Sequence, residues 1–294
     1  MNGVIVIDKP AGLTSHDVVN RVRRILGQRS VGHLGTLDPL ATGVLPIVLG
    51  NLTRLAQFYA HSDKTYEGVI RFGFATDTYD ADGEPVTAPQ AVEVSCDELR
   101  ALALQFCGVI EQMPPPFSAK KIAGVPAYKL ARKKQDVALK AVQVEIKDFE
   151  ILDAAGNQAT FRARVASGTY IRSVAHDMGQ KLGCGAHLAS LRRVAAAEFT
   201  IDDAHSLEAL QSAMQQGTVE SLFVHPRKLV PRLPCVTAGE ESAALIRSGR
   251  AVNLPEMSRA PQVKVFYGQR DLIAIATRVA GTLFHPGIVF SSQN

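Results

Sequence analysis

Hydrophobic positions near the start of the chain follow two different periods. Residues 3–7 and 43–49 are nearly continuous apolar runs bounded by glycine or proline, which is typical of buried strands. Between them, the apolar residues of 15–26 recur every three or four positions, with Ser15 as the candidate N-cap and Gly27 as the stop. This pattern predicts a strand, an amphipathic helix and a second strand; "YEGVIRFGF" adds a further buried strand.

Apolar and polar residues alternate over 142–154 and 158–170, and this alternation predicts half-buried antiparallel strands. Helical spacing follows these two strands over 170–183. It also precedes them over 95–108, where Ser95 and Glu98 have the spacing of a capping box. Helices are mixed with strands in hairpin-like succession. The expected class is therefore α+β with a mainly antiparallel mixed sheet flanked by helices.

A proline-rich stretch, "FVHPRKLVPRLPCV", marks the expected domain boundary. Short apolar runs broken by Gly and Asp follow it, which is typical of a compact β-barrel-like unit. We therefore expect a large domain over 1–230 and a small one over 231–294.

Composition narrows the class of protein. The chain has 294 residues, 46% of them hydrophobic, and no apolar run approaches the roughly 18 residues of a membrane span, so no membrane partner is expected. The start of the chain lacks the features of a signal peptide. Its four cysteines are scattered without a C-x-x-C pair, which argues against structural zinc and disulfides and favours a reducing cytoplasm.

The stretch "VGHLGTLDPLATGVLPIVLG" places a lone carboxylate, Asp38, on a glycine-rich turn between apolar segments. A buried functional carboxylate there needs a cationic partner from elsewhere in the fold. Asp-Pro pairs also begin ordinary turns, and that alternative stays open. No Lys follows Gly43, so the turn lacks the spacing of a phosphate-binding loop.

A second acidic stretch, "DTYDADGEP", does not fit an EF-hand, because Thr78 and Pro89 would occupy ligand positions one and twelve. Two alternatives remain for it, a polar turn and a carboxylate that orients a catalytic group.

Residues 117–140 are strongly basic, with one acid, Asp136, among seven basic residues: Lys120, Lys121, Lys129, Arg132, Lys133, Lys134 and Lys140. Aromatic and glycine residues are interleaved with the charges, which favours an arm lying on an RNA backbone over a merely solvated face. Arg192 and Arg193 form a second basic group, and Arg21, Arg23 and Arg24 a third.

Five segments, "DKPAGLTS", "GHLGTLDPLATGVLPIVLG", "KTYEGVIRFGFATDTYDADGE", "PPPFSAKKIAGVPAYKLAR" and "GTYIRSVAHDMGQKLG", resemble motifs of the bacterial TruB-type tRNA pseudouridine synthases, in the family's order. The resemblance covers roughly residues 3–200. It implies the pseudouridine synthase fold followed by a small PUA-like RNA-binding domain. It also implies isomerisation of uridine to pseudouridine at position 55 in the T-arm loop of tRNA, on a nucleotide that is flipped out.

The resemblance also implies roles for individual residues. Asp38 corresponds to the nucleophile, Tyr66 to a tyrosine that stacks on the base, and Arg172 to the arginine that pairs with the aspartate. His33 corresponds to the histidine that enters the T-loop, and Tyr170 and Leu191 to the walls of the uridine pocket. The other expected substrate or RNA contacts are Asp80, Lys9, Lys121, Lys133, Lys134, Arg192 and Arg193.

Isomerisation involves no net redox change or group transfer, so neither a cofactor nor a metal is expected. The expected partner is the T-arm stem-loop of tRNA, bound by a monomer without an obligate protein partner. The alternative is a non-catalytic protein of the same fold that binds or folds tRNA. The combined presence of Asp38, Tyr66 and Arg172 favours the enzyme.

Overall fold

A computed structural model describes residues 1–117, 121–122, 125–126 and 140–290, with side chains in 1–117 and 140–290. One mixed sheet of ten strands dominates the described residues, in the order β12-β1-β3-β10-β4-β9-β8-β5, with β2 paired to β3 and β11 to β10. Its strands are β1 (Gly3–Lys9), β2 (Val31–His33), β3 (Thr42–Leu49), β4 (Lys64–Phe72), β5 (Gly108–Gln112), β8 (Val142–Ala155), β9 (Gln158–Val165), β10 (Ala186–Ala196), β11 (Phe199–Thr200) and β12 (Ala204–His205). A separate two-stranded ribbon pairs β6 (Lys121–Ile122) with β7 (Val125–Pro126).

The pairings of β1 with β12 and of β3 with β10 are parallel, and the other pairings of this sheet are antiparallel. The expected α+β class with a mainly antiparallel mixed sheet is confirmed.

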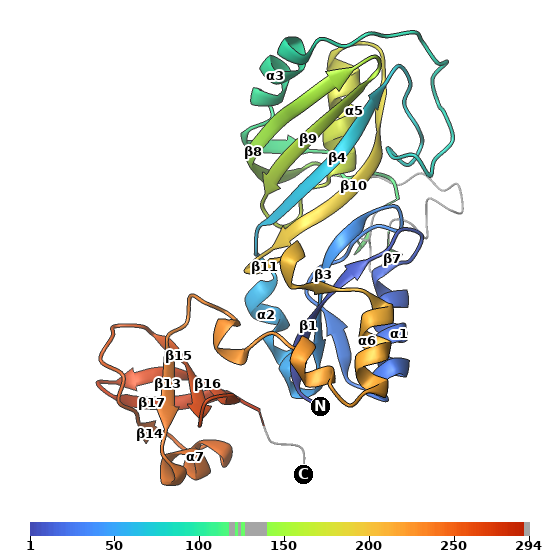
Figure 1. Cartoon of the computed structure of the whole chain (residues 1–294). Coiled ribbons are helices and arrows are strands. Elements are labelled where there is room, and N and C mark those ends of the chain that lie inside the picture. The colour runs from blue at the N-terminus through green and yellow to red at the C-terminus, as the bar shows by residue number, and fades with distance from the viewer. Residues whose placement is uncertain (118–120, 123–124, 127–139, 291–294) are drawn as a thin grey trace.

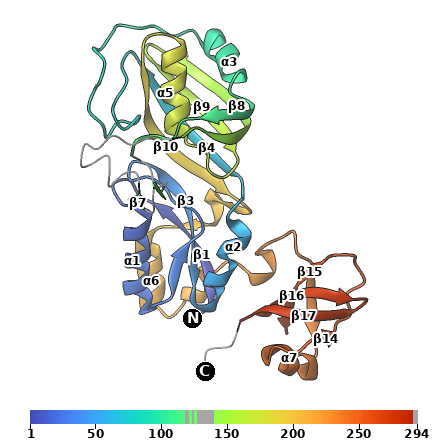
Figure 2. The ribbon, with the colours of Figure 1, turned by 180° about the vertical axis from the view of Figure 1, so that it is seen from behind.

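Helices cover the sheet in two groups (Figure 1). Near the N-terminus, α1 (Ser15–Leu26) and α6 (Leu207–Gln215) lie side by side, and at the other end α3 (Cys96–Leu104) and α5 (Ile171–Lys181) pack on the sheet. The view from behind shows the same grouping, with α2 (Ala56–Tyr59) toward the C-terminal unit (Figure 2). The amphipathic spacing of α1 buries Val18, Val19 and Val22 in the main core.

Two expected helix caps differ from those observed. The N-cap of α1 is Thr14, which forms a capping box with Asp17, so Ser15 is free for another role. The capping box expected at α3 is wrong, because Ser95 makes no side-chain bond to the helix. At the other end of α1, Gly27 adopts φ +59° and ends the helix as expected.

The two halves of the sheet meet at a short seam. There β3 and β10 are joined by only two residue pairs, Thr42 with Arg192 and Gly43 with Arg193. Gly43 has φ +99°, and a Cβ built on it would lie 2.2 Å from the Arg193 carbonyl oxygen. Only glycine fits this close backbone approach.

We expect Gly43→Ala to lower the free energy of unfolding by about 2–5 kcal/mol, because the new methyl group meets backbone that cannot yield. Gly27→Ala is the matched control: it shares a left-handed φ, but nothing lies within 4 Å of its Cβ. That control should cost about 1 kcal/mol. Denaturant titration measures both, and equal losses would contradict the steric explanation.

The C-terminal unit is a five-stranded half-barrel, in the order β13-β15-β16-β17-β14, with α7 (Glu240–Arg247). Its strands are β13 (Cys235–Ala238), β14 (Val252–Asn253), β15 (Gln262–Tyr267), β16 (Asp271–Ala280) and β17 (Leu283–Val289). Phe266 and Leu272 of this unit share one apolar cluster with Val4 and Val48 of the large sheet. The boundary at 230/231 stays a prediction. Across the described residues, no helix is both long and apolar enough to cross a membrane.

Candidate functional site

The loop between β2 and β3, strand β4 and the start of α5 enclose a pocket of about 430 Å³. That volume lies within the range of about 300–1,000 Å³ common for small-molecule sites. Six residues singled out in the sequence line it: His33, Asp38, Tyr66, Tyr170, Arg172 and Leu191. They come from four separate parts of the chain, and the fold brings them together.

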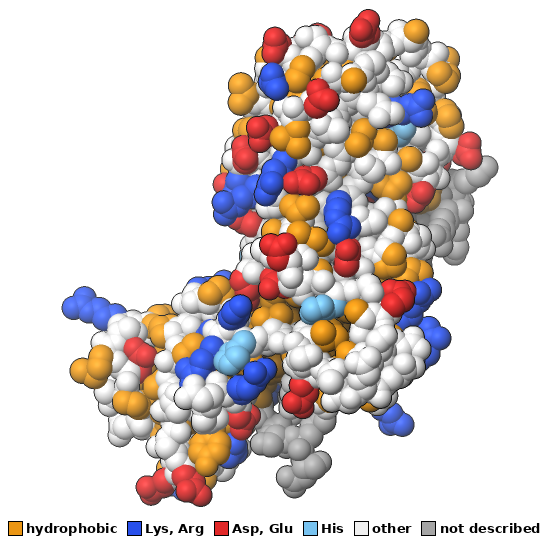
Figure 3. Space-filling view, in the orientation of Figure 1, with side chains coloured by type: hydrophobic (Ala, Val, Ile, Leu, Met, Phe, Trp, Pro, Cys, Tyr) orange, Lys and Arg blue, Asp and Glu red, His pale blue; other side chains and the backbone are white. Residues whose placement is uncertain are grey.

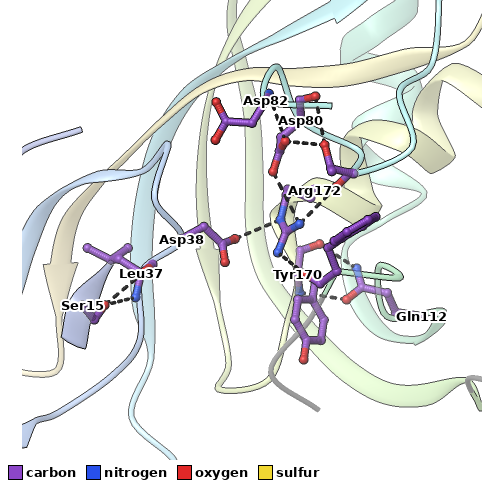
Figure 4. Close-up of polar contacts among 10 residues, drawn as sticks. Ser15, Leu37, Asp38, Asp80, Asp82, Gln112, Tyr170 and Arg172 are labelled. Atoms are coloured by element: carbon purple, nitrogen blue, oxygen red, sulfur yellow. Dashed lines mark hydrogen bonds and ion pairs between the residues drawn. The ribbon is translucent and has the colours of Figure 1, made fainter. Parts of the chain in front are cut away.

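An ion pair stands at the centre of the pocket. Arg172 Nε lies 2.9 Å from Asp38 Oδ2, and Arg172 Nη1 lies 3.4 Å from Asp80 Oδ2. The guanidinium also donates to the carbonyls of Thr78 (3.1 Å) and Phe117 (3.0 Å). Figure 4 shows Arg172 between the two carboxylates. Two backbone carbonyls and the buried Asp80 carboxylate fix the direction of the guanidinium.

The three side chains of these ion pairs differ sharply in their exposure to solvent. The Asp38 side chain is 38% exposed, whereas those of Arg172 and Asp80 are only 6% and 7% exposed. A ligand in the pocket can therefore reach the Asp38 carboxylate more readily than the largely buried guanidinium. Burial raises the pKa of Asp38 above its ordinary value, and the Arg172 charge opposes that rise.

The turn that carries Asp38 is fastened from the N-terminal segment. Leu37 N–H donates to Ser15 Oγ at 2.8 Å, and Ser15 Oγ donates to the Leu37 carbonyl at 3.1 Å. Lys9 Nζ donates to the carbonyls of Pro10, Leu13 and Pro39. These bonds hold both sides of Asp38, a role for Ser15 that the sequence did not reveal.

Two residues expected to contact the substrate or RNA lie in the interior of the protein. Lys9 and Arg193 are both completely buried. Arg193 donates to the carbonyls of Gly35, Thr36 and Val44, and so fastens the other side of the Asp38 turn. Cations this deep have no surface for a phosphate backbone, and their hydrogen bonds shape the pocket instead.

Lys9 gives a pH-dependent prediction. Burial lowers the pKa of Lys9 from 10.5 to about 8. Between these values the unfolded chain binds more protons than the folded one, so the free energy of unfolding rises with pH in this window. We expect a rise of about 2 kcal/mol between pH 7 and pH 10, relative to Lys9→Met. Urea titrations of both proteins measure it; parallel pH curves would contradict it.

Asp80 lies behind Arg172 rather than at a surface. It is 5% exposed, and its Oδ1 accepts from Thr78 Oγ1 and from the Asp82 N–H. The expected contact of Asp80 with the substrate or RNA stays a prediction. Of the two alternatives for its stretch, the carboxylate that orients another group agrees with this geometry.

An aromatic and an aliphatic side chain form part of the pocket wall. Tyr66 on β4 and Leu191 on β10 are each 8% exposed, and both line the pocket. Tyr170 is anchored by Gln112, whose side chain accepts from its N–H (2.8 Å) and donates to its carbonyl (3.1 Å). Gln112 was missed in the sequence because it lies on β5, far along the chain and in no recognisable motif.

The other residues expected to contact RNA are Arg192, Lys121, Lys133 and Lys134. Arg192 is paired with Asp8 at 2.8 Å, and its side chain is 41% exposed. Lys121 lies on β6, and nothing is described of its side chain; Lys133 and Lys134 fall outside the described residues. On the face in Figure 3, basic and acidic side chains are interspersed.

Together these features make a pocket with one reachable carboxylate, Asp38, and a fixed counter-charge, Arg172. Among the described side chains, no group of three or more His, Cys, Asp or Glu residues could hold a metal ion. The arrangement suits a flat, uncharged ring between apolar walls, with a nucleophilic oxygen at its edge.

Comparison with known proteins identifies the family of the chain. The N-terminal domain of the TruB family pseudouridylate synthases matches residues 23–171, and the C-terminal domain of tRNA pseudouridylate synthase B matches residues 172–230. A tRNA pseudouridine synthase B from Solibacter usitatus is 48% identical over 98% of this chain and 100% of its own length. One from Bacillus cytotoxicus is 38% identical over 94% of this chain and 92% of its own.

A solved structure shares the fold. The crystal structure of an archaeal box H/ACA Nop10–Cbf5 complex aligns with a TM-score of 0.70 and 26% identity, covering 98% of this chain and 86% of that one. The sequence profile, the near full-length relatives and the fold agree. The chain belongs to the TruB family of pseudouridylate synthases.

Proposed function

We propose that this enzyme converts uridine to pseudouridine at position 55 in the T-arm loop of tRNA, with Asp38 as the nucleophile. The observation that carries the proposal is the exposed Asp38 carboxylate, held by a buried Arg172 at 2.9 Å inside a pocket of about 430 Å³. The relatives that match nearly the whole chain are named tRNA pseudouridine synthase B, which supports tRNA as the substrate.

The reaction breaks the N1–C1′ bond, turns the uracil ring and forms the C5–C1′ bond, while the proton on C5 is lost and N1 gains one. Atoms and electrons balance within the nucleoside, so the enzyme supplies an anionic oxygen, a proton path and confinement of the ring. Asp38 is the anion. Tyr66 and Leu191 are placed to confine the ring, and their burial keeps water from the freed uracil.

A stacked uridine cannot reach this pocket, so the nucleotide must leave the loop, at a cost of a few kcal/mol. His33 lies at the rim of the same pocket, where it is placed to fill the vacated space. Burial lowers the pKa of His33 below its ordinary value. We also propose that the enzyme acts as a monomer, without a protein partner.

The test is to incubate the full chain with an unmodified T-arm hairpin, without added metal or nucleotide, and to map pseudouridine by position. Product at position 55 is expected, with none when that uridine is replaced by cytidine. A protein that only binds or folds tRNA would retain the hairpin and leave every uridine unchanged. That outcome, or product at another position, would contradict the proposal.

A further inference from the structure

Helix α5 contacts the loop over residues 76–82 twice, one turn apart. Arg172 and His176 are four residues apart on this helix and therefore share a face. The His176 ring stacks on Tyr79, with ring centroids 3.8 Å apart and planes inclined by 12°. Tyr79 lies between Thr78 and Asp80, the two residues of this loop that contact Arg172.

The backbone at Tyr79 controls the position of both neighbours. Arg172 Nη1 donates to the carbonyl of Thr78 on one side and pairs with the carboxylate of Asp80 on the other. The Tyr79 carbonyl accepts from the Leu188 N–H of β10 at 3.0 Å. A change in the Tyr79 backbone angles would therefore move both acceptors of Nη1 together.

The backbone at Tyr79 has a conformation that is intrinsically unfavourable for a tyrosine. Tyr79 has φ +66°, the left-handed region that disfavours residues with a Cβ. Backbone hydrogen bonds to Thr76 and Leu188 hold it there, and the stacked His176 ring is an aromatic contact from outside the loop. His176 Nδ1 is buried without a hydrogen-bond partner among the described residues, and burial lowers the pKa of His176. The histidine therefore acts through its ring face.

We propose that the stack of Tyr79 on His176 positions Arg172 for the reaction. It holds the left-handed turn, the turn holds the Thr78 carbonyl and Asp80, and these direct the guanidinium at Asp38. Neither aromatic residue lines the pocket, so both are positioning residues. The inference rests on the proposed role of Asp38.

The test measures single-turnover rates of pseudouridine formation, with enzyme in excess over a T-arm hairpin. His176→Ala should lower the rate constant about tenfold or more and leave the dissociation constant for the hairpin within about twofold. His176→Phe keeps a flat face against Tyr79 and should restore the rate. Gln180→Ala, at an exposed position on the next turn of α5, is the matched control and should match wild type.

The same His176→Ala substitution, made in a Tyr79→Gly variant, tests how the stack acts. Glycine adopts a left-handed φ without strain, so Tyr79→Gly removes the need for an external hold. In that background, His176→Ala should change the rate constant by less than about twofold. At saturating enzyme, a partly unfolded variant whose folded fraction still exceeds the hairpin reaches the full rate constant, whereas mispositioning lowers the rate constant itself.

Three results would overturn the inference. They are a wild-type rate constant in His176→Ala, no recovery of the rate constant in His176→Phe, or the same fold-loss of rate from His176→Ala in the wild-type protein and in Tyr79→Gly. Asp38→Asn in the same series separates the two proposals. If Asp38→Asn makes no product while His176→Ala reacts at the wild-type rate, only the positioning inference is wrong. Product from Asp38→Asn at the wild-type rate would overturn both.

Discussion

An Asp38→Asn variant should bind an unmodified T-arm hairpin as wild type does and form pseudouridine at least about a thousandfold more slowly. The amide has nearly the shape of the carboxylate, so the pocket keeps its walls and its volume. It lacks the anionic oxygen that the proposed reaction needs. The expected result is a loss confined to the chemical step.

The measurement is a single-turnover rate beside a binding titration of the same protein. Asp97→Asn is the matched control, because Asp97 lies in the first turn of α3 and its side chain is 93% exposed. It should react as wild type does. If Asp38→Asn reacted within about tenfold of that control, Asp38 would not be the nucleophile.

Arg172→Met should lower the rate by about a hundredfold or more and alter its pH dependence. Without the guanidinium, nothing at 2.9 Å opposes the effect of burial on the pKa of Asp38. That pKa then rises further, and the reactive ionised form appears only at higher pH. The acid limb of the pH–rate profile should therefore move to higher pH.

Arg100→Met controls for the loss of an arginine, since Arg100 lies on α3 and its side chain is 54% exposed. The acid limb of its profile should stay where it is in wild type. An Arg172→Met profile that falls at every pH without moving would show that Arg172 does not set the ionisation of Asp38. Circular dichroism on each variant checks that the buried position tolerates methionine.

Local patterns were enough to predict most of the fold. The alternation that gives β8 and β9, and the spacing that gives α1 and α5, depend on neighbours within a few residues. The glycine-rich turn at Asp38 was equally visible, because its segment is short and bounded by apolar runs. The cationic partner that the sequence required for Asp38 is Arg172.

Burial of the basic residues could not be predicted in this way. Arg193 was expected on an RNA-binding surface because it stands beside Arg192, yet their side chains alternate on β10 and face opposite environments. Its carbonyl partners are 149 to 158 residues away in sequence. Tyr79 and His176 are also far apart in the sequence, and no sequence pattern marked either ring as a partner of the other.

A crystal structure of Asp38→Asn bound to an unmodified T-arm hairpin would test the central claim most directly. We expect the uridine at position 55 to be flipped out, with its ring between Tyr66 and Leu191 and its ribose beside residue 38. A uridine still stacked in the loop, or seated in a different cavity, would contradict the account.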